Sequence, residues 1–377
     1  MNSTSLYGTS WNVLAPGWTE SPFLRPWKVP HRYDVCSDMD LITFHAFFNL
    51  ITTNANNGNG GNRSFSKTKQ YGPSLNLGSG IVSQVDRISR KAARKRTEVA
   101  FCGALKVSRD YLRPFVSELL VLLNSSLREH PHIVHLVGFE WDVQPSLGGV
   151  AHMAQIVPVI EVEYADQGTL AHFLKSQPLK KTLKLRQTLC HQVGLGLLAL
   201  HECWTIHGDL KPDNILVFTA DTPLGVTAKI CDFSHSLIGS PEDQTPVALP
   251  GGTPPWAAPE WKTHLPVSEL MTSDTFSFGL LVWSCFSLEN NPARLLARCM
   301  NNVTSEFKPE RLIDEACLSL RSISALPKTS KLPWKQPSAF EDSLGFVFRC
   351  TLAHTPKSRN LRNAVAAIDP DHLTAER

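Results

Sequence analysis

The run from His207 to Asn214, H-G-D-L-K-P-D-N, places a carboxylate, an ammonium group and an amide close together. It follows a helical apolar pattern that ends near His201 and precedes the apolar run 215–217. We expect the run to form a loop held between a helix and a strand, because the hydrophobic period changes across it. Side chains on such a loop can converge on one site.

Three side chains of this loop would supply complementary chemistry. Asp209 can accept the proton of a hydroxyl nucleophile. Asn214 can offer an oxygen to Mg²⁺, a hard ion that prefers such ligands. Lys211 adds positive charge where phosphoryl charge moves. The set therefore indicates phosphoryl transfer to a hydroxyl group.

The loop resembles the catalytic loop of protein kinases, H-R-D-x-K-x-x-N, with Gly208 in place of the Arg. Small-molecule phosphotransferases of the aminoglycoside and choline type also use H-G-D-x-x-x-x-N, but usually lack the Lys two residues after the Asp. Lys211 occupies that position here. The resemblance therefore favours a protein substrate and the Ser/Thr class.

A second carboxylate motif, Asp232-Phe233-Ser234, begins 18 positions after Asn214. It is similar to the D-F-G motif of protein kinases, with Ser234 in place of Gly. The resemblance implies that Asn214 and Asp232 hold Mg²⁺ together. The substitution bears on the backbone of the segment, because Gly adopts conformations that a Cβ penalises.

The segment 252–260, G-T-P-P-W-A-A-P-E, resembles the end of a kinase activation segment. The resemblance implies that Thr253 bonds the catalytic Asp and Lys, and that Glu260 forms a buried ion pair with Arg359. It also implies that Asp274 anchors the backbone of the catalytic loop. Small-molecule phosphotransferases have nothing comparable to this segment.

The stretch 77–85 is similar to the glycine-rich loop G-x-G-x-x-G-x-V, with Ser for the third Gly. Backbone N–H groups in such turns approach phosphate oxygens. The resemblance implies nucleotide contacts at Gly78, Gly80 and Val85.

Lys106 lies in the apolar stretch 104–107, where a charge is costly without a partner or ligand. It matches the phosphate-positioning lysine of V-A-I-K, and its expected partner is Glu118. The separation of 12 positions is shorter than expected for the family. Farther along, 159–165 resembles the hinge that binds adenine, which implies nucleotide contacts at Glu163 and Asp166.

The hydrophobic pattern predicts a strand-rich half followed by a helix-rich half. We expect strands at 77–88, 99–107, 133–139, 156–164, 215–217 and 228–230, and helices at 114–123, 185–200, 275–286 and 343–352. This order predicts an α+β, bilobal protein kinase fold. The predicted parts are an N-terminal extension with an Asn/Gly-rich linker at 1–70, an N-lobe at 71–164, a C-lobe at 165–368 and a tail at 369–377.

Composition limits the other function classes. A formal net charge of +3 gives no general attraction to nucleic acid or membrane. The basic cluster between Arg87 and Arg96 is therefore interpreted as a solvated turn between strands. The 9 cysteines form no C-x-x-C pair, and no secretory signal or membrane-spanning stretch is visible. We expect a soluble cytoplasmic protein, with a nuclear location as an alternative.

Taken together, the resemblance covers about 75–368 and implies transfer of the γ-phosphoryl group of ATP to Ser or Thr of a protein, with Mg²⁺. Because Gly208 replaces the Arg that receives an activation-loop phosphate in many kinases, we expect activity independent of such phosphorylation. The competing hypothesis is a pseudokinase, a binding or scaffolding module. Ser83, Ser234 and the short Lys106–Glu118 spacing motivate it.

Overall fold

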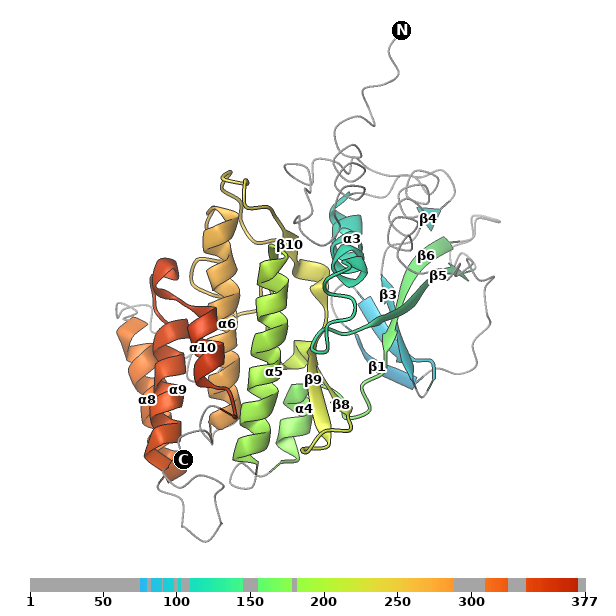
Figure 1. Cartoon of the computed structure of the whole chain (residues 1–377). Helices are drawn as coiled ribbons and strands as arrows, with labels where there is room; N and C mark the ends of the chain where they lie inside the picture. The colour runs from blue at the N-terminus through green and yellow to red at the C-terminus, as the bar shows by residue number, and fades with distance from the viewer. Residues whose placement is uncertain are drawn as a thin grey trace. The chain divides into compact units, whose positions relative to one another are not determined.

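The structure is a computed structural model, and its described residues form two compact units (Figure 1). One unit ends at Tyr164 and includes 238–240; the other comprises Ala165–Leu237 and the chain from Pro241 onward. The described residues are 75–79, 83–89, 91–97, 101–102, 109–144, 155–177, 182–287, 309–324 and 337–371. The predicted extension and linker at 1–70 lie outside them.

The first unit is built on an antiparallel sheet with one described helix. Its elements are β1 (Leu75–Ser79), β2 (Ser83–Arg87), β3 (Ala92–Thr97), β4 (Phe101–Cys102), α3 (Arg109–Leu123), β5 (Leu136–Gln144) and β6 (Gln155–Glu163). The strand order is β1-β2-β3-β6-β4, and β5 also pairs with β6. Strands β2 and β3 are consecutive and antiparallel, and a short turn joins them. In that turn the Ser89 hydroxyl accepts the N–H groups of Lys91 and Ala92.

The interpretation of the basic cluster as a solvated turn was wrong for most of its length. Strand β3 pairs with β2 on one side and β6 on the other. Ala92, Ala93 and Arg94 are buried within it. Ladder hydrogen bonds on both sides hold this strand, so its high charge density did not prevent strand formation.

Helix α3 begins earlier than the sequence predicted. It starts at Arg109, so Pro114 lies inside the helix and not in its first turn. A proline there removes only the hydrogen bond to the carbonyl of residue 110, close to the helix start. The buried residues Leu112, Phe115, Leu119 and Leu122 continue at helical spacing on either side of it.

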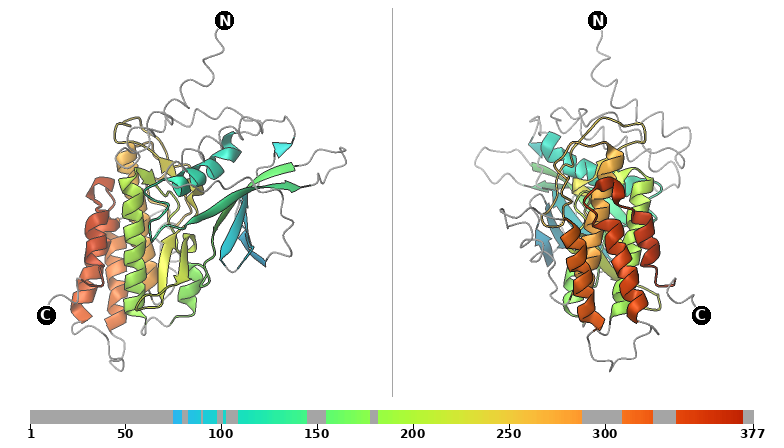
Figure 2. Two further views of the ribbon diagram at one scale, coloured as in Figure 1. Left: turned by 45° about the vertical axis from the view of Figure 1, so that its right-hand side comes forward. Right: turned by 90° about the vertical axis from the view of Figure 1, so that its left-hand side faces the viewer.

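The second unit is mainly helical. Its elements are α4 (Leu170–Lys175), α5 (Leu183–Glu202), β7 (Thr205–Ile206), the 3-10 helix η2 (Pro212–Asn214), β8 (Ile215–Thr219), β9 (Val226–Ile230), η3 (Phe233–His235), β10 (Leu237–Ile238), α6 (Val267–Phe286), α8 (Pro309–Ser324), α9 (Pro337–Thr351), η4 (Pro356–Ser358) and α10 (Leu361–Ala367). Helices α5, α6, α9 and α10 lie side by side, and the β8–β9 hairpin packs along α5 (Figure 2). A strand-rich region followed by helices confirms the predicted α+β protein kinase fold.

Close helix contacts hold the long helices of this unit together. A Cβ on Gly279 of α6 would lie 2.2 Å from the Thr351 hydroxyl of α9, and one on Gly194 of α5 would lie 2.5 Å from Val365 of α10. Both glycines therefore permit a backbone approach that any side chain would block. No helix within the described residues is both long enough and apolar enough to cross a membrane.

Candidate active site

The loop after β7 is fixed to helix α6 through one buried carboxylate. Asp274 accepts the backbone N–H of His207 at 2.7 Å and that of Gly208 at 3.0 Å. His201, near the end of α5, places Nε2 3.1 Å from the same carboxylate. The predicted anchoring of the loop by Asp274 is therefore present.

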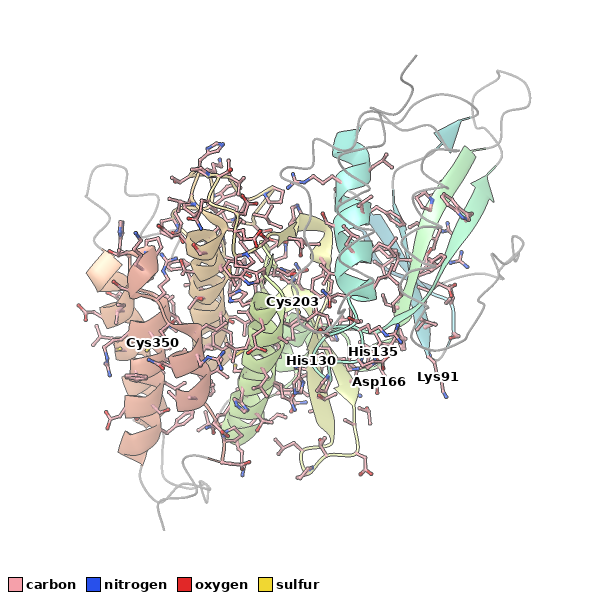
Figure 3. The ribbon with its side chains drawn as sticks, turned by 45° about the horizontal axis from the view of Figure 1, so that its top comes forward. Lys91, His130, His135, Asp166, Cys203 and Cys350 are labelled. Atoms are coloured by element: carbon pink, nitrogen blue, oxygen red, sulfur yellow. The ribbon has the colours of Figure 1, made fainter. Side chains whose placement is uncertain are left out.

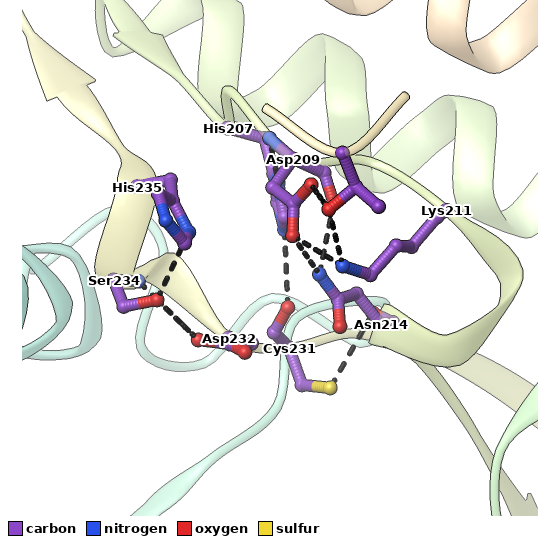
Figure 4. A network of polar contacts seen from close by, with 9 residues as sticks. His207, Asp209, Lys211, Asn214, Cys231, Asp232, Ser234 and His235 are labelled. Atoms are coloured by element: carbon purple, nitrogen blue, oxygen red, sulfur yellow. Dashed lines mark hydrogen bonds and ion pairs between the residues drawn. The ribbon is translucent and has the colours of Figure 1, made fainter. Parts of the chain in front are cut away.

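Both carboxylate oxygens of Asp209 are held by neighbouring side chains (Figure 4). Thr253 donates its hydroxyl to Oδ1 at 2.6 Å. Lys211 donates to Oδ2 at 2.6 Å and to the Thr253 hydroxyl at 2.8 Å. The Asn214 amide donates to Oδ2 at 3.1 Å and to the Asp209 carbonyl at 2.8 Å. The structure thus brings these four predicted residues together.

The His207 ring joins this loop to the segment that carries Asp232. Its Nδ1 accepts the Asp209 N–H at 3.1 Å, so Nε2 carries the proton and donates to the Cys231 carbonyl at 3.0 Å. The ring also packs on Phe233, with centroids 5.4 Å apart. The imidazole therefore sets the spacing between the two acidic segments.

Asn214 and Asp232 are suited to a divalent cation. The Asn214 amide nitrogen makes both of the hydrogen bonds described above, which orients Oδ1 away from them. Asp232 adopts a left-handed backbone conformation, with φ of 64°, two residues after the end of β9. Oxygen donors of these two kinds fit Mg²⁺ completed by nucleotide phosphates. No cluster of three or more His, Cys, Asp or Glu within the described part of the chain forms a separate metal site.

A buried ion pair joins Glu260, at the end of the activation segment, to Arg359 in the same unit. Arg359 makes a two-point contact with Glu260, and Ser273 donates to the same carboxylate at 2.9 Å. The guanidinium also donates to the carbonyls of Ala353 and His354. The predicted Glu260–Arg359 pair is therefore confirmed.

In the first unit, Lys95 contacts Glu118. Its Nζ lies 2.6 Å from Glu118 Oε2, joining β3 to α3 across 23 positions. Glu118 is thus an ion-pair residue, as predicted, and Lys95 is a partner that the sequence did not predict. Lys106 lies outside the described residues. The missed signal was Ala93-Arg94-Lys95, which has the A-x-K form of the family motif.

The remaining predicted nucleotide contacts of this unit are spread over its strands. Gly78 in β1 pairs with Val85 in β2, next to a register irregularity. Val85 in turn pairs with Lys95, whereas Gly80 lies outside the described residues. Glu163 ends β6, where its N–H donates to the His135 carbonyl at 3.1 Å and its carboxylate accepts the His135 N–H at 2.8 Å.

Asp166 belongs to the second unit and is labelled in Figure 3. Its carboxylate accepts the Thr219 N–H at 2.8 Å, the Thr219 hydroxyl and the Gln167 amide at 3.0 Å. Partial burial raises the pKa of Asp166, but these hydrogen bonds together lower it by more. The pKa of Asp166 therefore lies below its ordinary value. The side chain tethers its segment to β8, and a ribose contact there stays a prediction.

Residues 71–362 match the protein kinase domain family, and the chain belongs to that family. It is 25% identical over 296 residues to rat "Serine/threonine-protein kinase ULK3", an alignment that covers 78% of this chain and 57% of the relative. It is 31% identical over 171 residues to "Mitogen-activated protein kinase kinase kinase dlk-1" of Caenorhabditis elegans, covering 42% of this chain and 18% of that protein. A third relative, "Dual specificity protein kinase zakA" of Dictyostelium discoideum, is 30% identical over 236 residues, an alignment that covers 59% of this chain and 27% of that protein. The chain therefore spans little more than half the length of the ULK3 relative.

Proposed function

We propose that this chain transfers the γ-phosphoryl group of ATP to a Ser or Thr hydroxyl of a protein substrate. The observation that carries the proposal is the Asp209 carboxylate, bonded at both oxygens by Thr253, Lys211 and Asn214. A carboxylate held in this way is oriented before the nucleophile arrives, so little ordering is left for the reaction itself.

Each side chain of this group has a separate task. Asp209 binds the attacking hydroxyl, orients it and takes up its proton. Lys211 stabilises negative charge that moves through the site. Thr253 contacts both residues and so couples the activation segment to the catalytic loop. Together they orient the acceptor hydroxyl.

Nucleotide contacts are proposed for each unit by itself. Lys95, held by Glu118, would contact the phosphates in place of the predicted Lys106. Asn214 and Asp232 would hold Mg²⁺, which supplies charge neutralisation at the phosphates when bound. The assignment of Mg²⁺ to Asn214 and Asp232 rests on the oxygen donors that these two side chains offer.

Lys211 and Thr253 support the Ser/Thr class, and the relatives named as serine/threonine-protein kinases agree with it. The pseudokinase alternative has no support beyond Ser83, Ser234 and the short Lys106–Glu118 spacing that motivated it. A protein substrate and ATP complete the proposal. The small net charge of +3 and the scattered cysteines support a cytoplasmic location and no nucleic-acid partner.

The test uses purified full-length chain with labelled ATP, Mg²⁺ and a generic basic protein substrate. Asp209→Asn should abolish label transfer, because the amide cannot take up the proton. Asp213→Asn is the matched control, since Asp213 is exposed on the same loop. Transfer that survives in Asp209→Asn, or no transfer by the wild-type chain, would contradict the proposal.

A further inference from the structure

Ser234, the residue that departs from the family D-F-G pattern, is bonded to the carboxylate two positions before it. Its hydroxyl donates to Asp232 Oδ1 at 2.7 Å (Figure 4). A glycine at this position has no hydroxyl and makes no such bond. The substitution therefore adds a contact directly to a residue assigned to the metal.

The Asp232 carboxylate fixes the direction of that hydroxyl, and the neighbouring imidazole completes the chain of hydrogen bonds. His235 Nδ1 lies 3.3 Å from Ser234 Oγ. A hydroxyl has one proton, and an ionised carboxylate only accepts hydrogen bonds. The Ser234 proton is thus directed at Asp232, and His235 Nδ1–H is the donor to Ser234. The three side chains form one directed chain of hydrogen bonds.

Two glycines make room for His235. A Cβ on Gly208 would lie 2.5 Å from the His235 carbonyl oxygen, and a Cβ on Gly251 would lie 2.1 Å from the His235 ring. Gly208 thus makes room for the backbone of residue 235, whereas Gly251 makes room for the His235 ring. Gly208, with φ of +78°, also adopts a conformation that favours glycine.

The backbone at Ser234 tolerates a side chain. Within the described residues, positive φ at non-glycine positions occurs only at Trp204 and Asp232. Ser234 itself is buried, at 6% exposure, so water competes little for its hydroxyl. The serine therefore fits this segment without left-handed strain.

We propose that Ser234 is a positioning residue that orients the Asp232 carboxylate toward a nucleotide-bound divalent cation, with His235 donating a hydrogen bond to the Ser234 hydroxyl. The inference rests on the proposed function only for the identity of the ligand, Mg²⁺ with a nucleotide. Groups that hydrogen-bond a metal-binding carboxylate fix its orientation, and their loss commonly weakens metal binding about 10- to 100-fold. The serine would thus supply rigidity that the family glycine does not.

The experiment measures the dissociation constant of a non-hydrolysable ATP analogue, once with Mg²⁺ and once with EDTA. Ser234→Ala and Ser234→Gly should each weaken binding about tenfold with Mg²⁺ and leave binding in EDTA unchanged. The effect of Ser234→Ala should disappear in an Asp232→Asn background, because the carboxylate that Ser234 orients is then absent. Ser284→Ala is the control, since its hydroxyl donates to the Leu281 carbonyl within α6.

Equal weakening with and without Mg²⁺, a persistent effect in Asp232→Asn, or tighter binding by Ser234→Gly would each overturn the inference. Thermal unfolding of each variant tests whether the chain still folds. Analogue binding needs no phosphoryl transfer. A chain that binds the analogue in a Mg²⁺- and Ser234-dependent manner but transfers no label would overturn the proposed function and leave this inference standing.

Discussion

Lys95 Nζ lies 2.6 Å from Glu118 Oε2, and the two side chains are only 11% and 5% exposed. The pair connects a central strand, β3, to helix α3. Removing two charges from water is costly, and a buried pair often stabilises a fold no better than apolar residues would. The pair is therefore weak evidence for the stability of the fold.

The first prediction compares the two lysines. Lys95→Met should lower phosphoryl transfer about 100-fold or more, because it removes a fixed positive charge from the phosphates. Lys106→Met, the residue chosen from sequence, should retain most of the activity. Measurement of kcat/KM for ATP in both variants checks this. The reverse order of the two losses would return the assignment to Lys106.

The second prediction concerns the space around Gly208. Gly208→Ala places a Cβ against the His235 carbonyl and should both destabilise the chain and reduce activity. Gly225→Ala is the matched control, since its φ of +73° is similar but nothing lies within 4 Å of the added Cβ. The control should cost only about 1–2 kcal/mol of left-handed strain, with activity unchanged. Chemical denaturation and a transfer assay on both variants separate strain from steric displacement, and equal losses in the two would show that the His235 contact is unimportant.

The third prediction is that activity needs no phosphate on the activation segment. Gly208 offers no guanidinium to receive one, so the double variant Ser240→Ala/Thr245→Ala should keep its kcat. Ser236 is excluded from this set, because it is fully buried and its hydroxyl donates to the His207 carbonyl. Loss of transfer in the double variant, with thermal unfolding unchanged, would show that phosphorylation is required.

The fourth prediction separates a buried ion pair from an exposed one. Arg359→Ala should lower the free energy of unfolding by about 3–5 kcal/mol, because it leaves the Glu260 charge buried and unpaired. Arg362→Ala, whose partner is Glu202, should change it by less than about 1 kcal/mol. The two arginine side chains are 0% and 73% exposed, respectively. Urea denaturation of the two variants side by side is the measurement, and similar losses would contradict this account.

The fifth prediction is a pH dependence of stability from His191 on α5. Burial lowers the pKa of His191 from its usual 6.5, although Asp369 and Asp371 act to raise it. The unfolded chain therefore binds this proton more readily than the folded one. The stabilisation is complete above pH 6.5 and is lost as the pH falls toward the lower folded pKa. His191→Gln should show a smaller drop in Tm between about pH 7.5 and about pH 5.5 than the wild-type chain; an identical drop would exclude this residue as a source.

Sequence alone was sufficient for the residues that act close together along the chain. Asp209, Lys211 and Asn214 lie on one short loop, so their types and spacing already predicted their convergence. The helical pattern that ends near His201 predicted α5, because its apolar residues repeat on one face. Local order of this kind depends on neighbours in the chain.

Only the tertiary structure decided which distant residues meet. Strand β3 has a charged sequence and was interpreted as a turn, yet pairing on both sides made it a strand and brought Lys95 to Glu118. The space that Gly208 leaves for the backbone of His235 likewise depends on how segments pack. Sequence determined the chemistry available to this protein, whereas packing selected the partners, because ladder pairing and steric fit are set by residues far apart in the chain.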